Sequence, residues 1–144
     1  MTKNTKSVLF IDDDKATNFL NERIARNYGC FNKVVTVQSG IQGLQYLTTC
    51  HSDINKKPDL IFLDINMPAM NGWEFLDEFY KMPETFTRGI KIVILSTSSE
   101  PKDIDKFNKN KKLLDYINKP INLDVLNNVM RKFSDVTKSN IGFG

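Results

Sequence analysis

Five short apolar runs that alternate with segments of helical periodicity constrain the fold of this chain more than any other feature. The runs lie at 6–11, 34–37, 59–63, 91–95 and 114–117. Their branched and aromatic residues and their short lengths favour strands that are buried on both faces. Because parallel strands need crossover connections, five strands separated by helices predict a parallel sheet covered by helices on both faces.

Apolar residues at helical spacing mark the segments between the strands. The first helix is expected over 15–28, where Gly29 gives it a natural end. Its apolar positions are Ala16, Phe19, Leu20, Ile24 and Tyr28. Further helices are expected after the cap residue Ser39, over 73–80, from Pro101 onwards and over 123–133.

Length and composition are typical of one globular domain. The 144 residues are 40% hydrophobic and 26% charged, which is enough for a single core without metal or disulfide bridges. We expect one domain over 1–144, with a core at about 7–133 and a flexible tail at 134–144. Cys30 and Cys50 lack the spacing of a zinc site and are expected to be reduced thiols.

The charge and the apolar runs argue against several classes of partner. Lys+Arg 20 and Asp+Glu 17 leave a net charge of +3, and only Lys109, Lys111 and Lys112 form a tight basic group. This is weak support for nucleic-acid binding, and no nucleic acid is expected as a partner. No apolar run is long enough for a signal peptide or a membrane span, so we expect a cytoplasmic protein without membrane contact.

Polar residues follow the predicted strands at the point where each strand ends. Asp12 and Asp13 follow the first strand, Asp64 the third, Ser96 the fourth and Lys119 the fifth. The carboxyl ends of parallel strands meet at one edge of a sheet, so these side chains are expected to converge there. Clustered carboxylates repel one another unless cations neutralise them, which calls for a divalent ion, the lysine or both.

The residue types at this edge point to phosphate chemistry. Oxygen ligands without histidine or cysteine favour Mg2+ or Mn2+, which keep waters that a phosphate can displace. Asp64 is placed to attack a phosphorus atom as a carboxylate nucleophile. The metal ion and Lys119 would then neutralise the oxygens of the transferred group.

Four motifs taken together resemble the receiver domains of two-component response regulators. They are Ile11-Asp12-Asp13-Asp14, Asp64-Ile65-Asn66-Met67-Pro68 with Asn71-Gly72, Leu95-Ser96-Thr97 and Asn118-Lys119-Pro120. Their order and spacing agree with that family from about Ser7 to Phe133. The resemblance implies a stand-alone, chemotaxis-regulator-like receiver. It also implies a flavodoxin-like α/β fold, a doubly wound five-stranded parallel sheet of strand order 2-1-3-4-5.

The resemblance implies a role for each acidic residue of the site. Asp13 and Asp64 would bind Mg2+ directly, and Asn66 would offer its backbone carbonyl to the same ion. Asp12 would act on the ion mostly through water. Asp64 would be the residue that accepts the phosphoryl group.

The remaining motif residues would sense the phosphoryl group. Ser96 would hydrogen-bond a phosphoryl oxygen, Lys119 would form a salt bridge in the site, and Pro120 would follow a cis peptide bond. Tyr116 matches the aromatic residue that turns inward when the domain switches. The resemblance implies that Ser96 and Tyr116 move together when phosphate is bound.

The same resemblance implies the partners. A sensor histidine kinase or a histidine phosphotransfer protein would donate the phosphoryl group, and a target protein would bind the region 101–133. The chain would be a monomer or would dimerise on phosphorylation. It would act as a signalling domain and not as an enzyme, although it would promote its own phosphorylation and dephosphorylation. Phosphate relay and direct action on a target stay open as alternatives.

Other interpretations of the same residues also stay open. Asp14 is better explained as a helix cap than as a ligand, and Tyr116 could be a half-buried packing residue. A haloacid-dehalogenase-type phosphatase shares the aspartate, Mg2+ and the lysine, but it needs an acid where this chain has Asn66. A pseudo-receiver would keep the fold as a binding module and would not be phosphorylated.

Overall fold

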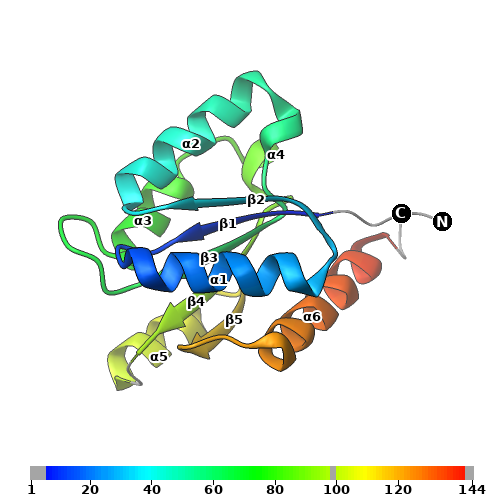
Figure 1. The fold of residues 1–144 in the computed structure, drawn as a ribbon. Coiled ribbons are helices and arrows are strands. Elements are labelled where there is room, and N and C mark those ends of the chain that lie inside the picture. Colours follow the sequence, from blue (N-terminus) through cyan, green and yellow to red (C-terminus); the bar gives the residue numbers. More distant parts are fainter. Residues whose placement is uncertain (1–5, 98–99, 142–144) are drawn as a thin grey trace.

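A computed structural model describes residues 6–97 and 100–141 of the chain. Its five strands are β1 (Lys6–Ile11), β2 (Phe31–Val37), β3 (Leu60–Asp64), β4 (Lys91–Ser96) and β5 (Leu113–Asn118). All pairs of neighbouring strands are parallel, in the order β2-β1-β3-β4-β5 (Figure 1). The predicted doubly wound α/β fold and its strand order 2-1-3-4-5 are confirmed.

The helices connect successive strands. They are α1 (Lys15–Tyr28), α2 (Gly40–Ser52), α3 (Gly72–Phe79), α4 (Glu84–Thr87), α5 (Pro101–Lys109) and α6 (Leu123–Ile141), with a 3-10 turn η1 (Ile54–Lys56). The short α4 and η1 were not predicted from the sequence. Helix α6 continues to Ile141, so residues 134–141, expected in a flexible tail, are helical, and 142–144 lie outside the described residues.

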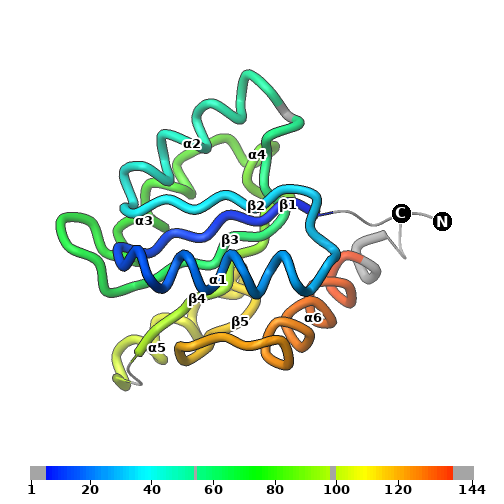
Figure 2. Tube along the Cα trace, viewed as in Figure 1, coloured from blue at the N-terminus to red at the C-terminus, as the bar shows by residue number. Residues whose placement is uncertain are grey.

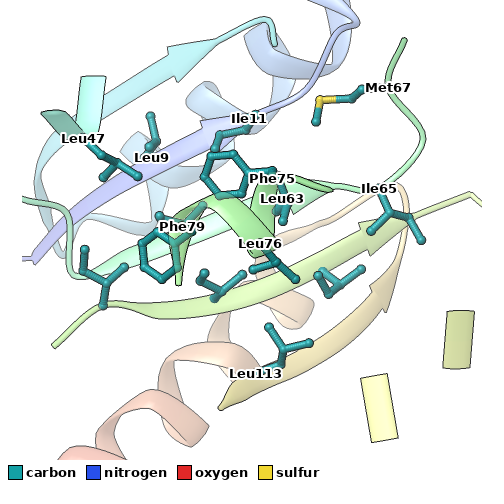
Figure 3. Packing of buried hydrophobic residues seen from close by; sticks show 14 of the residues in the cluster. Leu9, Ile11, Leu47, Leu63, Ile65, Met67, Phe75, Leu76, Phe79 and Leu113 are labelled. Atoms are coloured by element: carbon teal, nitrogen blue, oxygen red, sulfur yellow. The ribbon is translucent and has the colours of Figure 1, made fainter. Parts of the chain in front are cut away.

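Two apolar layers hold the helices on the sheet. Helices α2, α3 and α5 cover one face, and α1 and α6 cover the other, as the path of the chain shows (Figure 2). On the first face Leu9 and Leu63 of the sheet pack with Phe75 and Phe79 of α3 (Figure 3). On the second face Phe10 and its neighbour on β3 stack their rings 5.0 Å apart. No helix in the described part of the chain is long and apolar enough to span a bilayer.

Helix α1 does not bury all of the apolar positions that predicted it. Phe19 and Leu20 are 61% and 56% exposed. The buried positions of α1 are instead Asn18, Asn21 and Ala25. Two polar residues of α1 are therefore buried together with Ala25.

Candidate functional site

The first three predicted site residues form one cluster at the carboxyl end of the sheet. Ile11 of β1 lies beside Leu63 of β3, so the acids that follow these two strands are neighbours. Each of Asp12, Asp13 and Asp64 places one carboxylate oxygen within 4.8 Å of the others. We call these three residues the acidic edge. Asp12 is 1% and Asp64 3% exposed, whereas Asp13 is exposed.

Lys119 brings a positive charge to the acidic edge from β5. Its Nζ lies 2.7 Å from Asp12 Oδ2 and 3.4 Å from Asp64 Oδ2, and its side chain is 14% exposed. The backbone N–H of Lys119 donates to the carbonyl of Ser96 over 2.8 Å, which fixes the start of the loop after β5. The Lys119–Pro120 peptide bond is cis, as the family resemblance implied.

The carboxyl group of Asp64 lies in an environment that opposes its charge. Burial, and then the negative charge of Asp12, raise the pKa of Asp64 to about 6. The backbone N–H of Asn66, which donates to Asp64 Oδ1 over 3.1 Å, and the ammonium of Lys119 both lower this pKa and compensate in part. For Lys119, burial disfavours the charged form, but the hydrogen bond to Asp12 and the charge of Asp64 outweigh it and raise the pKa.

The donor set of the acidic edge fits a small hard cation. It consists of oxygen atoms only, and three carboxylates face the single ammonium of Lys119, so negative charge is in excess. Asp12 Oδ2 is a buried atom whose charge is compensated by the ammonium of Lys119, 2.7 Å away. Mg2+ prefers a few carboxylate ligands and retained waters, which the exposed position of Asp13 allows.

Asn18 is a residue of the site that the sequence analysis missed. Its side-chain amide donates to the carbonyl of Asp12 over 2.9 Å and to the carbonyl of Val37 over 3.0 Å. It therefore ties the ends of β1 and β2 together beneath the acidic edge. Asp14 is the N-cap of α1 and accepts from the backbone N–H groups of Ala16 and Thr17, which confirms its interpretation as a cap.

The turn between β3 and α3 holds the backbone around Asp64 in place. Asn71 caps α3 by accepting from the N–H of Glu74, whose side chain accepts from the N–H of Asn71 in return. Gly72 donates its N–H to the carbonyl of Ile65 over 3.0 Å. A Cβ at Gly72 would lie 2.7 Å from the Cα of Ile65 and 2.9 Å from the carbonyl oxygen of Asp64, so only glycine fits this approach.

The predicted sensing residues lie on β4, which neighbours β3, and on β5, which neighbours β4. Ser96 ends β4, is fully buried, and pairs with Asn118 in the sheet. Because Leu95 pairs with Asp64, Ser96 follows directly at the same edge. Tyr116 of β5 is half-buried, and its ring meets the ring of Phe107 edge-on at 5.7 Å. Ser96 thus lies at the same edge of the sheet as the acidic edge, while Tyr116 lies on the adjoining strand β5 against α5.

A second contact that the sequence analysis did not anticipate links α3 to α5. The indole Nε1 of Trp73 donates to Asp103 Oδ1 over 2.9 Å, and Asp103 is 7% exposed. The ammonium of Lys106 lies 5.6 Å from the centre of the Trp73 ring. A lone tryptophan and an aspartate thirty residues apart give no sequence signal for such a pair, because neither belongs to a local motif.

Known proteins resemble this chain in sequence. Response regulator Rcp1 of Synechocystis is 27% identical over 100 residues, which cover 69% of this chain and 67% of that protein. Sporulation initiation phosphotransferase F of Bacillus subtilis is 25% identical over 130 residues, which cover 89% of this chain and 93% of that protein.

Solved structures share the fold of this chain, and a family model matches its sequence. A two-component response regulator from Cytophaga hutchinsonii superposes with a TM-score of 0.84 at 32% identity, covering 92% of this chain and 99% of that one. A two-component response regulator from Legionella pneumophila gives a TM-score of 0.75 at 27% identity, covering 91% and 99%. The sequence model described as "Response regulator receiver domain" matches residues 8–131. The chain therefore belongs to the family of response regulator receiver domains, the signalling domains of two-component systems.

Proposed function

We propose that this receiver accepts a phosphoryl group on Asp64 from a histidine kinase or a histidine phosphotransfer protein. The observation that carries the proposal is the convergence of three carboxylates, one ammonium and a buried serine at one edge of the sheet. The N–H of Asn66 and the ammonium of Lys119 orient the carboxylate of Asp64. The N–H of Asp14 and Lys119 hold Asp12 in a similar way, so the choice of Asp64 as the acceptor rests on its match to the receiver motif after the third strand.

The transfer would exchange one bond to phosphorus for another. A carboxylate oxygen of Asp64 attacks the phosphorus of a phosphohistidine, the new O–P bond forms, the P–N bond breaks, and the departing imidazole takes up a proton. Asp13, Asp64 and the backbone carbonyl of Asn66 would hold Mg2+, with Asp12 acting on it mostly through water, and the ion would neutralise charge on the phosphoryl oxygens. Lys119, already 3.4 Å from Asp64, would move its ammonium toward the same oxygens.

The signal would leave through α5, β5 and α6, that is, the region 101–133. Ser96 would donate its hydroxyl to the phosphoryl group, and Tyr116 would shift on the neighbouring strand. A hollow of about 490 Å3 lies on this side of the molecule, between Tyr116 of β5 and Val125 and Arg131 of α6. It offers a protein target a recess whose border includes Tyr116. The chain would act as a monomer or as a dimer formed on phosphorylation.

The first turns of α1 support a protein as the phosphoryl donor. Helix α1 begins directly after the acidic edge, and its Phe19 and Leu20 are 61% and 56% exposed. Two exposed apolar side chains next to each other offer a small apolar contact for another protein at this edge. A donor that covers them would bring its phosphohistidine close to Asp64.

Intact-mass spectrometry after incubation with acetyl phosphate tests the proposal. We expect one phosphoryl adduct on the wild type with Mg2+ present, and none on Asp64→Asn or after chelation of the metal. Asp77→Asn removes an exposed acid from α3 and serves as the matched control, which should be phosphorylated like the wild type.

Two outcomes would contradict the proposal. An unmodified wild type, incubated with Mg2+ and with both acetyl phosphate and a phosphorylated histidine donor, would favour a pseudo-receiver that only binds partners. Steady hydrolysis of a phosphate monoester would favour a phosphatase, although Asn66 cannot transfer the proton that such an enzyme needs at this position.

A further inference from the structure

A second cavity lies at the opposite end of the sheet from the acidic edge. It has a volume of about 280 Å3 and lies among the ends of α3 and α6, the helix α4 and the starts of β4 and β5. Lys91 and Leu113 are the first residues of β4 and β5 and line it. Because the strands are parallel, their starting ends lie a full strand length away from Asp64 and Lys119.

Positive charge is concentrated around this cavity. Arg88, Lys91, Lys111 and Lys112 line it, against the single carboxylate of Glu84. Across residues 6–97 and 100–141, the ion pairs of the structure involve other basic residues and none of these four. The whole chain has nearly balanced charge, with 20 basic and 17 acidic residues. The excess of positive charge from four cations outside ion pairs is therefore a property of this cavity and not of the chain as a whole.

The walls of the cavity are apolar and aromatic. Tyr80, Ile90, Leu113 and Val136 line it together with the cations. The ammonium of Lys112 lies 4.9 Å from the centre of the Tyr80 ring, a contact that holds the charge beside the wall. Burial raises the pKa of the Tyr80 hydroxyl, so the phenol stays neutral and adds no negative charge.

A hydroxyl completes the set of groups that a ligand would meet. Thr87 of α4 lines the cavity and is 7% exposed. Its hydroxyl can donate to an oxygen or accept from a nitrogen. An enclosed apolar wall with a few polar groups and several cations is the usual make-up of a site for a small anionic ligand. The volume is near the lower end of such sites, which start at about 300 Å3, so a compact ligand fits and a dinucleotide does not.

We propose that this cavity, the basic pocket, binds a small organic phosphate of mononucleotide size. Its phosphate would face Arg88, Lys91, Lys111 and Lys112, and its organic body would lie on the wall formed by Tyr80 and the neighbouring aliphatic residues. The site uses none of the residues of the acidic edge. It is therefore separate from the phosphorylation site at Asp64, and a metabolite bound there would be a second ligand of the domain, at the starts of β4 and β5.

The test is a titration of the isotope-labelled full chain with adenosine monophosphate, followed by amide nuclear magnetic resonance. EDTA is present, so that no metal ion at the acidic edge can recruit the phosphate, and ionic strength is held constant. We expect saturable shifts centred on Ile90, Leu113 and Leu114. Adenosine alone and inorganic phosphate alone should each bind at least about tenfold more weakly, because each lacks half of the contacts.

Two charge-matched double variants make the test specific. Arg88→Gln with Lys112→Gln should weaken binding about tenfold or more, since both cations contact the phosphate. Lys33→Gln with Lys56→Gln removes the same charge from elsewhere on the surface and should bind like the wild type. All four residues except half-buried Lys33 are exposed, so both variants should keep the wild-type melting temperature.

Four results would overturn the proposal. They are no saturable shifts at millimolar adenosine monophosphate, shifts centred outside the basic pocket, equal weakening in both double variants, and inorganic phosphate binding as tightly as the nucleotide. The last result would mean that the apolar wall contributes nothing. Because Asp64 is not involved, none of these results bears on phosphorylation of the acidic edge.

Discussion

At the scale of single residues, the ionised carboxylate of Asp64, which the proposed phosphorylation needs, lowers the stability of the fold. Its folded pKa, about 6, lies above the ordinary value of 3.8 because the carboxylate is buried beside Asp12. Between these two pH values the folded state binds more protons than the unfolded state, so stability falls as pH rises through this window. At neutral pH without metal, the ionised acid therefore destabilises the fold.

Asp64→Asn is accordingly expected to stabilise the metal-free protein at neutral pH. The gain in free energy of unfolding should be at most about 3 kcal/mol, because one pKa unit corresponds to about 1.4 kcal/mol. Urea unfolding in EDTA measures it, with the exposed acid Asp77→Asn as control. The gain should shrink at about pH 5, where the wild-type carboxyl group is mostly protonated. A gain that is unchanged at the lower pH would contradict the assignment of the penalty to this charge.

Asn18→Ala tests the residue that ties β1 to β2. The change removes two hydrogen bonds and leaves the carbonyls of buried Asp12 and half-buried Val37 with one donor fewer. We expect a loss of about 1–3 kcal/mol in the free energy of unfolding. Asn27→Ala, at an exposed position of the same helix, should change it little. Equal effects of the two substitutions would show that Asn18 acts only through helix propensity.

At the scale of elements, the turn from β3 into α3 determines where Asp64 points. Gly72→Ala would force its Cβ against the backbone of Ile65 and Asp64, at 2.7 and 2.9 Å. The backbone must shift, which should cost about 1–3 kcal/mol and slow phosphorylation of Asp64. Gly89→Ala is the control, because its Cβ would meet only the flexible end of Lys57, at 3.3 Å. Unfolding and acetyl phosphate kinetics of both variants would decide the matter, and equal behaviour would contradict this role of the turn.

The elements show what a sequence alone can and cannot predict. The strands were predictable because a sheet covered on both faces demands continuous apolar runs, and the site residues followed because they end those strands. Helix α4, Glu84–Thr87, is a single turn and too short for periodicity to reveal. Hydrophobic spacing could not predict that Asn18 of α1 is buried while Phe19 stays exposed, because Asn18 is buried where it makes its two hydrogen bonds.

The same distinction applies to the contacts between elements. The pair Trp73–Asp103 and the cation group of the basic pocket each join residues from different helices and loops. Their chemistry depends on distances that only the folded chain sets. The continuation of α6 to Ile141 was missed because the residues after Phe133 are mostly polar and give little apolar periodicity.

At the scale of the whole molecule, Mg2+ should raise the melting temperature by a few degrees, because it binds the folded acidic edge and not the unfolded chain. Asp13→Asn should abolish most of this rise, because it removes one carboxylate ligand of the ion. The variant should still fold, because Asp13 is exposed and the buried pair of Asp12 and Lys119 stays intact. Asp14→Asn keeps a good helix cap beside the site and should respond like the wild type. An undiminished rise in Asp13→Asn would place the ion elsewhere.

The most direct test of the central claim is to locate the phosphoryl group chemically. Borohydride reduces an aspartyl phosphate to homoserine, so the phosphorylated protein can be reduced, digested and mapped by peptide mass spectrometry. The account predicts homoserine at position 64 alone, and none in protein that was treated with EDTA before phosphorylation. Homoserine at Asp12 or Asp13, or an unmodified Asp64 in a protein that carries the phosphoryl group, would contradict it.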